Sequence, residues 1–487
     1  MTFYVNKRKP SLAAYRDVIR FIFLWGPFLV FVQTGCKKFV QVDPPTIAIT
    51  SAVVYTNDLS AAAAVTSIYD NMMSNFNGLS QGYQSISCLA GLTADEFENY
   101  SPIAALAQCY TNTLSSANNY FWPEIYQEIH VANAVLEGLS NSSGVTSAEK
   151  QQLIGEALFM RAFLHFYGTN IYGDIPLVTT TNYLVNNTIQ RSPQSQIFQQ
   201  VIADLKNAQS SLSNNFLTPT GGIPTTERVR PNKGAATALL ARAYLYIGAW
   251  DSAEAQSTSV INNTATYGLV MNLDSVFLMN SMEAIWQMQP VYPGYNTFDA
   301  YNFVLASPPG HGNNPVALTP NLVYAFEVGD QRRVNWVDSL TSAGQTYYYP
   351  YKYKVSAYNQ AVTEYLMVLR LAEQFLIRAE ARAQQGNLSG AAADLNIIRM
   401  RAGLGATAAA TKQDLLNAIY HERQVELFTE WGHRWFDLKR TGNIDLVMSI
   451  VTPEKGGSWS PDWALFPIPQ SEISLNPNLT QNTGYSN

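Results

Sequence analysis

The sequence has few charged residues, few cysteines and no long hydrophobic run. Only 14% of its 487 residues are charged, against roughly a quarter in ordinary globular proteins, which argues against a disordered or coiled-coil chain. No run of about eighteen apolar residues is present, so an ordinary membrane-spanning helix is not expected. The net charge is −6 and no basic block occurs, so a nucleic-acid partner is not expected either.

The three cysteines, Cys36, Cys88 and Cys109, are too few for a disulfide framework or a zinc site. Cys88 and Cys109 could still pair in an oxidising compartment. Aromatic residues make up 12% of the chain, which indicates a large core or a surface on which ligands stack. The length allows two to four domains or one large one.

Residues 1–35 have the pattern of an export signal. A basic head precedes the mainly apolar run Phe21–Val32, which ends near Gly35 and Cys36. A cysteine directly after the cleavage point is typical of a bacterial lipoprotein, in which that cysteine is lipidated. We therefore predict a lipoprotein signal over 1–35 and lipidation of Cys36. The alternatives are a plain exported protein, or a buried N-terminal helix with a free cysteine.

Helical periodicity dominates the remaining chain. Apolar residues at steps of three and four, such as Leu153, Ala157, Met160 and Leu164, mark one buried helix face. The pattern predicts helices near 58–75, 117–139, 148–171, 195–212, 232–248, 250–262, 364–385, 389–402, 412–431 and 433–441.

Two stretches lack this periodicity, 77–116 and 263–362. They are rich in Tyr, Asn, Pro and Gly, and their aromatic content predicts long ordered loops with short strands rather than disorder. Loops of this length inside a domain are usually functional.

A spacing of small residues occurs twice in the helical parts. Ala241-x6-Gly248-x4-Ala253 recurs as Ala379-x6-Gly386-x4-Ala391. Small residues at these positions let two antiparallel helices approach closely, with glycine at the turn, which is typical of tetratricopeptide-type hairpins. Two unrelated helix pairs with a glycine turn are the alternative.

Several segments along the chain together resemble one known family. They are Trp122-x3-Tyr126-x2-Ile129-x3-Asn133, GEALFMRAFLHFYGTNIYGDIPLV at 155–178, RPNKGAATALLARAYLY at 230–246, Glu283-x-Ile285-Trp286, Asp330-x-Arg332, KYK at 352–354, LRLAEQFLIRAEA at 369–381, LNIIRMRAGL at 395–404, ERQVELFTEWGHRWFDLKR at 422–440 and LFPIPQSEISLNPNLTQNTGY at 465–485. In order and number they resemble the SusD/RagB family, the outer-membrane nutrient-binding lipoproteins of Bacteroidetes.

The resemblance implies a mostly α fold. Tetratricopeptide-type hairpins would form an α-α superhelix, at about 58–76, 117–262 and 364–441, and a loop-rich, partly β ligand-binding region would pack on it within a single domain, 36–487. It also implies a lipid-anchored protein that faces the cell exterior, binds an oligosaccharide or related nutrient, and passes it to a SusC-like TonB-dependent transporter. No catalysis and no cofactor is implied.

Acidic residues near the C-terminus invite a catalytic interpretation. Glu422, Glu426 and Glu430 recur at four-residue steps, and paired carboxylates can hydrolyse glycosidic bonds. Arginines lie within helical reach of each acid, however, so a structural ion-pair network is favoured over a glycoside hydrolase. Arg161 and Glu156 are interpreted in the same way, as core ion-pair residues. No metal-binding, nucleophile or phosphate-loop motif is present.

The two irregular stretches carry the chemistry that sugars need, aromatic rings beside amides and carboxylates. The ligand-binding residues that we predict are Tyr100, Asn99, Asp95, Tyr83 and Tyr110 from 77–116, and Tyr292, Tyr295 and Asn296 from 290–303. Phe97, Tyr301 and Asp299 accompany them. For any single ring, filling the interior of the loop region is the alternative, and Asp95 could instead cap a helix or bind a cation. A tetratricopeptide scaffold for a protein or peptide is the alternative function, although such a scaffold needs no long tyrosine-rich insertions.

Overall fold

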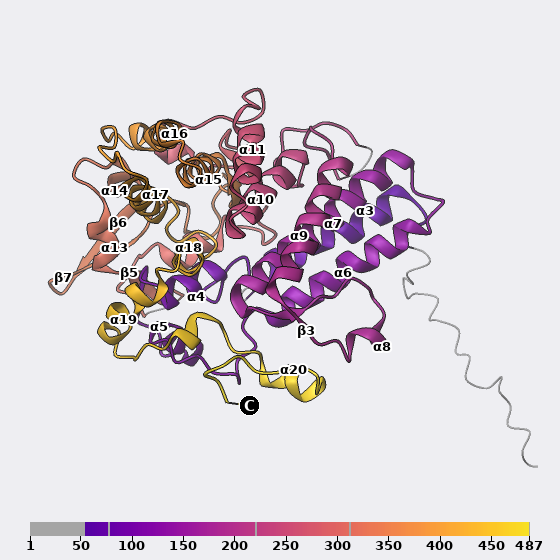
Figure 1. The fold of residues 1–487 in the computed structure, drawn as a ribbon, viewed down its shortest axis with the longest axis horizontal. Helices are drawn as coiled ribbons and strands as arrows, with labels where there is room; N and C mark the ends of the chain where they lie inside the picture. The colour runs from indigo at the N-terminus through magenta and orange to yellow at the C-terminus, as the bar shows by residue number, and fades with distance from the viewer. Residues whose placement is uncertain (1–53, 76–77, 220–221, 311–312, 487) are drawn as a thin grey trace, which may run out of the picture. The chain divides into compact units, whose positions relative to one another are not determined.

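Helices are the main secondary structure of the computed structural model, which describes residues 54–75, 78–219, 222–310 and 313–486 (Figure 1). All of these residues belong to one compact unit, Ser51–Asn487. The predicted signal segment and Cys36 lie outside the described residues. The mostly helical fold class is confirmed. The helices are α3 (Asp58–Ser74), α4 (Ile86–Thr93), α5 (Ala104–Tyr110), α6 (Trp122–Ser140), α7 (Ser147–Tyr172), α8 (Tyr183–Asn186), α9 (Gln194–Ser211), α10 (Lys233–Tyr246), α11 (Trp250–Ile261), α12 (Phe298–Phe303), α13 (Pro320–Ala325), α14 (Gln331–Asn335), α15 (Leu371–Gln384), α16 (Leu388–Arg401), α17 (Lys412–Glu426), α18 (His433–Arg440), α19 (Ile444–Glu454) and α20 (Gln470–Leu475).

The repeated small-residue spacing produces two helix hairpins, as predicted. In the first, α10 and α11 are joined at Gly248, and in the second α15 and α16 are joined at Gly386. Both glycines have positive φ, 71° and 84°, a conformation that a side chain disfavours. The four alanines of the spacing are fully buried where the helices meet. Helix α11 also packs on α15, so the two hairpins are neighbours despite their separation in sequence.

Helix α7 organises the first half of the chain. It packs against α6, α9 and α3, and nearly all of its side chains after Gln152 are buried. Two charged residues inside it have partners from other elements: Arg161 pairs with Asp204 at 2.7 Å, and Glu156 pairs with Arg230 at 2.6 Å. The interpretation of Arg161 and Glu156 as core ion-pair residues is confirmed.

The strands form four two-stranded antiparallel sheets among the described residues. The pairs are β1 (Phe97–Asn99) with β5 (Val316–Leu318), β2 (Ile175–Pro176) with β3 (Arg191–Ser192), β4 (Ala284–Met288) with β8 (Leu366–Arg370), and β6 (Val337–Ser342) with β7 (Gln345–Pro350). Most of these strands lie in the two stretches that were predicted to be loops with short strands.

Three local predictions are wrong. The helix expected over 364–385 begins only at Leu371, because the buried run before it is strand β8, and a short apolar run fits either structure. The stretch 77–116 is not purely irregular, since it contains α4, β1 and α5. Helix α17 ends at Glu426 instead of continuing to residue 431, and the chain then turns through the positive φ angles of Thr429 and Trp431.

Cys88 and Cys109 are both buried as free thiols, so they do not pair. Burial raises the pKa of the Cys109 thiol to about 12, which keeps it protonated and unreactive. None of the helices in the described residues has the length and apolar character needed to cross a membrane.

Candidate functional site

The first predicted stretch presents Tyr100 at the end of a short strand pair. Asn99 is opposite Val316 in the β1–β5 ladder, and the Tyr100 backbone N–H donates to the Pro315 carbonyl at 2.9 Å. The Tyr100 hydroxyl donates to a Glu98 carboxylate oxygen at 2.7 Å, which holds the ring half-exposed beside a negative charge. Partial burial, and then this hydrogen bond to Glu98, raise the pKa of Tyr100, so its hydroxyl stays protonated.

Two further tyrosines surround Tyr100. The Tyr347 ring on β7 meets it edge-on, with 5.5 Å between centroids. Tyr110 ends α5 and is half-exposed, and its pKa is raised by burial and by the Glu98 charge, which places it in the same group. Tyr347 was not among the residues predicted from the sequence, although the tyrosine run at 347–349 is a signal that could have identified it.

The second predicted stretch builds a group of rings around Tyr295. Its ring stacks on Phe298 and also contacts Tyr301 and Tyr358, with centroids 5.0–5.1 Å away in each case. Gly294 makes the contact with Tyr358 possible, because its φ is +85° and a Cβ there would lie 2.7 Å from that ring. Tyr358, which the sequence analysis also missed, is 61% exposed.

Buried contacts link the two stretches that carry these rings. Phe97 of β1 contacts Phe303 of α12, with centroids 5.1 Å apart. The Asn314 side chain donates to the backbone carbonyls of Tyr301, Asn302 and Val304, and the next residue, Pro315, accepts the Tyr100 bond. We call the resulting group of half-exposed and exposed rings the aromatic surface; it comprises Tyr100, Tyr110, Tyr295, Tyr301, Tyr347 and Tyr358.

Two predicted polar partners do not belong to the aromatic surface. Asp95 is 6% exposed and holds the Arg434 guanidinium in two hydrogen bonds of 2.7 Å. Burial alone would raise the pKa of Asp95, but Arg434 outweighs burial and the pKa is lowered. Asn296 is 2% exposed and is bonded to the backbone at 361, 363 and 364. Both side chains hold the fold together and are withdrawn from a ligand.

The other predicted residues occupy intermediate positions. Tyr292 is half-buried, and its hydroxyl donates to the Ser74 carbonyl at the end of α3. Tyr83 lies in the turn before α4 and packs against the core. The Asn99 side chain is half-exposed and forms a turn with Ser101, accepting from its N–H and donating to its carbonyl. Of the predicted polar groups, Asn99 alone remains accessible beside the rings.

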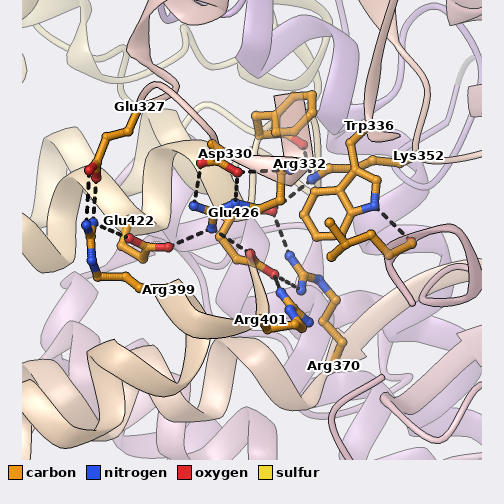
Figure 2. Close-up of polar contacts among 12 residues, drawn as sticks. Glu327, Asp330, Arg332, Trp336, Lys352, Arg370, Arg399, Arg401, Glu422 and Glu426 are labelled. Carbon is orange, nitrogen blue, oxygen red and sulfur yellow. Dashed lines mark hydrogen bonds and ion pairs between the residues drawn. The ribbon is translucent and has the colours of Figure 1, made fainter. Parts of the chain in front are cut away.

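The acidic residues near the C-terminus form a buried ion-pair network (Figure 2). Glu426 is at its centre: it meets Arg332 at 2.8 Å and Arg370 at 2.5 Å, and it also pairs with Arg401. These arginines come from α14, β8 and α16, not from the helix of Glu426. The members, which we call the charged network, are Glu283, Asp330, Arg332, Lys352, Arg370, Arg399, Arg401, Glu422, Glu426 and Glu430.

The charged network is structural, as favoured from the sequence. Burial alone would raise the pKa of Glu426, but its three arginines outweigh burial and hold that pKa well below the usual range. Glu422 and Glu426 are fully buried, and the cavity that touches Lys352 and Glu430 measures about 10 Å³, far too small for a sugar. The prediction that helical neighbours pair with these acids is wrong, since Arg423 pairs with Asp437 instead.

Among the described residues no cluster of three or more His, Cys, Asp or Glu is placed to hold a metal ion. The aromatic surface presents accessible rings, with the Glu98 carboxylate and the Asn99 amide beside Tyr100, a chemistry that suits ligands with apolar faces flanked by hydroxyls.

Family models match both halves of this fold. One, described as the SusD family, covers residues 337–485, which include β7, the second hairpin and the acids Glu422, Glu426 and Glu430 of the charged network. Another, described as "Starch-binding associating with outer membrane", covers residues 49–245, which include Tyr100 and α10. The chain belongs to the SusD/RagB family. This SusD-like chain is therefore a member of a family of binding proteins and not of enzymes.

Relatives match this SusD-like chain over most of its length. SusD-like protein P2 of Formosa agariphila is 27% identical over 425 residues, which cover 75% of this chain and 80% of the relative. A SusD-like carbohydrate-binding protein from Bacteroides fragilis has the same fold, with a TM-score of 0.74, 21% identity and coverage of 88% and 100%. A laminarin-binding SusD-like protein gives a TM-score of 0.71, 24% identity and the same coverage.

Proposed function

We propose that this chain is an outer-membrane lipoprotein that binds an oligosaccharide or related nutrient on its aromatic surface and delivers it to a SusC-like TonB-dependent transporter. The observation that carries the proposal is the packing of two loop stretches that both carry accessible rings, with the Glu98 carboxylate and the Asn99 amide beside the first group of rings. Rings stack on the C–H faces of sugars, while carboxylate and amide groups bind the hydroxyls.

The printed names of the relatives support the ligand class. Two solved structures of this fold are named as carbohydrate-binding and laminarin-binding proteins, and a matching family model is named for starch binding and outer-membrane association. The predicted signal over 1–35 and Cys36 supply the membrane attachment. Because a tethered binding protein has no pore, uptake needs a separate transporter, and tethering both to one membrane raises their effective concentration.

The binding proposal is tested by calorimetry with laminari- and malto-oligosaccharides and the signal-free protein. Alanine at Tyr100 or Tyr295 is expected to weaken binding by about 1–3 kcal/mol with nearly unchanged melting temperature, because each ring is only half-buried. Tyr183→Ala on α8, which removes a ring that is 66% exposed, is the matched control and should bind normally. Normal affinity in the Tyr100/Tyr295 double variant would move the site elsewhere.

Attachment and partner need separate measurements. Cys36→Ala is expected to move the protein from the membrane fraction to the soluble fraction, and unchanged fractionation would contradict lipidation. The wild-type protein is expected to copurify with a large outer-membrane transporter from detergent-solubilised membranes. Repeated recovery of the protein alone would contradict the proposed partner.

A further inference from the structure

A cleft of about 660 Å³ lies between helix α3 and the chain segment 288–291. Ala63, Thr66, Ser67 and Asp70 line one side, and Met288 to Val291 line the other. We call it the α3 cleft. Its volume falls in the range of small-molecule sites, and none of the residues predicted to bind a ligand belongs to it.

The two sides of the α3 cleft differ in chemistry. On the α3 side, Thr66 and Ser67 donate their hydroxyl protons to helix carbonyls one turn back, at 3.1 Å and 2.8 Å, so their oxygens face a ligand as acceptors. Asp70 adds an exposed carboxylate, also an acceptor. The opposite side is mainly apolar, with Met288, Pro290 and Val291. A sugar ring, which has hydroxyl donors at its edge and C–H groups on its faces, fits between such walls.

The charges at the α3 cleft select a neutral ligand. Arg230 lies at its base but is 3% exposed and pairs with Glu156 at 2.6 Å and Glu149 at 3.8 Å. The Tyr69 hydroxyl donates to the same Glu156 carboxylate at 3.0 Å. The one cation among the lining residues is thus neutralised from within the protein, while Asp70 is exposed. An anionic glycan would meet repulsion without a compensating cation.

Ring contacts connect the edge of the α3 cleft to the aromatic surface. Tyr292 directly follows the cleft residue Val291, and its hydroxyl donates to the Ser74 carbonyl at 2.7 Å, one helical turn after Asp70. The Tyr292 ring contacts Phe298 at 5.8 Å, and Phe298 stacks on Tyr295 at 5.1 Å. Two ring contacts therefore separate the α3 cleft from the centre of the aromatic surface.

We propose that the α3 cleft is a second subsite for the glycan held on the aromatic surface, and that it binds further units of a neutral, chain-like oligosaccharide. This inference rests on the proposed function. A short ligand occupies the aromatic rings alone, whereas a longer one also reaches the hydroxyls of α3. Affinity therefore rises with chain length, and that rise depends on α3.

The experiment is calorimetry with neutral laminari- and malto-oligosaccharides, from disaccharide to octasaccharide. Ala63→Trp fills the α3 cleft from an exposed helix position, and Asp70→Asn removes its charge without changing its shape. Both are expected to lower octasaccharide affinity, Ala63→Trp by on the order of tenfold, while disaccharide affinity stays within about twofold. Leu59→Trp, at a 69% exposed position of the same helix outside the cleft lining, is the control and should leave both affinities unchanged.

The outcomes separate the two proposals. If octasaccharide affinity is unchanged in both cleft variants while Tyr295→Ala weakens binding, the α3 cleft is not a subsite and the aromatic surface stands. If the wild-type protein binds no oligosaccharide of any length, the proposed function itself fails. A preference of the wild-type protein for carboxylated or sulfated glycans over neutral ones would overturn the assigned ligand class.

Discussion

The charged network and the aromatic surface both attract attention in the sequence, yet they differ in solvent access. The network gathers acids and bases from six separate segments, and its central residues Arg332, Glu422 and Glu426 are fully buried. The aromatic surface gathers tyrosines from three segments, and its rings remain half-exposed or exposed. A buried charge must be matched inside the protein, whereas a half-exposed ring keeps a face for a ligand.

This difference teaches that charge clustering alone is a poor indicator of function. Every acid of the network has a cation within ion-pair distance, so its binding capacity is used within the fold. The aromatic surface and the α3 cleft instead keep ring faces and acceptor oxygens accessible to solvent. Substitutions in the network should therefore change stability, and substitutions in the aromatic surface should change binding.

The largest expected effect is loss of stability on Glu426→Gln. The amide keeps the shape of the side chain but leaves Arg332, Arg370 and Arg401 without their shared carboxylate in a buried site. We expect the free energy of unfolding to fall by about 3–5 kcal/mol, measured by urea denaturation. Oligosaccharide binding at a temperature where the variant is folded should be unchanged. Loss of sugar binding with normal stability would assign the network to function instead.

The next effect concerns Asp299, which lies on α12 between Tyr295 and Tyr301 and is 5% exposed. Burial, and then the Glu430 charge, raise the pKa of Asp299 to about 8. The pKa of Asp299 is higher in the folded state than in the unfolded state, so the protonated carboxyl makes its full contribution to the free energy of unfolding below about pH 4. That contribution is lost as the pH rises to 8.

Asp299→Asn removes this pH dependence. Relative to wild type, the variant should gain on the order of 1–3 kcal/mol of unfolding free energy between pH 5 and pH 8, measured by urea denaturation. Binding by the aromatic surface should be retained. A stability difference between the two proteins that does not change with pH would contradict the prediction.

A smaller effect is expected for Gly294→Ala in the aromatic surface. The new methyl group would collide with the Tyr358 ring and strain the backbone, so the rings of Tyr295 and Tyr358 would have to separate. We expect a loss of about 1–2 kcal/mol in oligosaccharide affinity by calorimetry. Gly386→Ala is the matched control, because its φ is also positive, at 84°, but no atom lies within 4 Å of the added carbon. Equal affinity in Gly294→Ala and wild type would show that this ring pair does not contact the ligand.

The smallest effect is expected at Glu327, an acid outside the charged network that pairs with its member Arg399. The Glu327 side chain is 42% exposed and meets Arg399 at 2.5 Å. Glu327→Gln should lower the free energy of unfolding by less than about 1 kcal/mol, because solvent screens the pair. The same urea titration compares it directly with Glu426→Gln. A loss as large as that of Glu426→Gln would show that burial does not set the strength of these pairs.

The sequence alone was sufficient for the features that depend on neighbours along the chain. The helix hairpins at Gly248 and Gly386 follow from small residues at fixed spacing, because close approach of two helices depends on residues within one hairpin. Most helices and the two loop-rich stretches were predictable because their patterns also depend on neighbouring residues. The family was predictable from the order and number of short sequence segments. The end of α17 and strand β8 were not predictable from the sequence. A turn or a buried apolar run can be distinguished from a continuing helix only when its packing partner is known.

Only the tertiary structure decided which polar groups are available to a ligand. Asp95 and Asn296 are residue types that can bind sugar hydroxyls. In the structure, however, Asp95 binds Arg434, and Asn296 binds the backbone at 361–364. Glu426 pairs with arginines of α14, β8 and α16, and Tyr100 contacts Tyr347, which belongs to the other loop-rich stretch. These partners are far apart in sequence, and their meeting depends on how the hairpins pack. The sequence pattern of one segment does not reveal that packing, because the pattern is the same whichever segment packs against it.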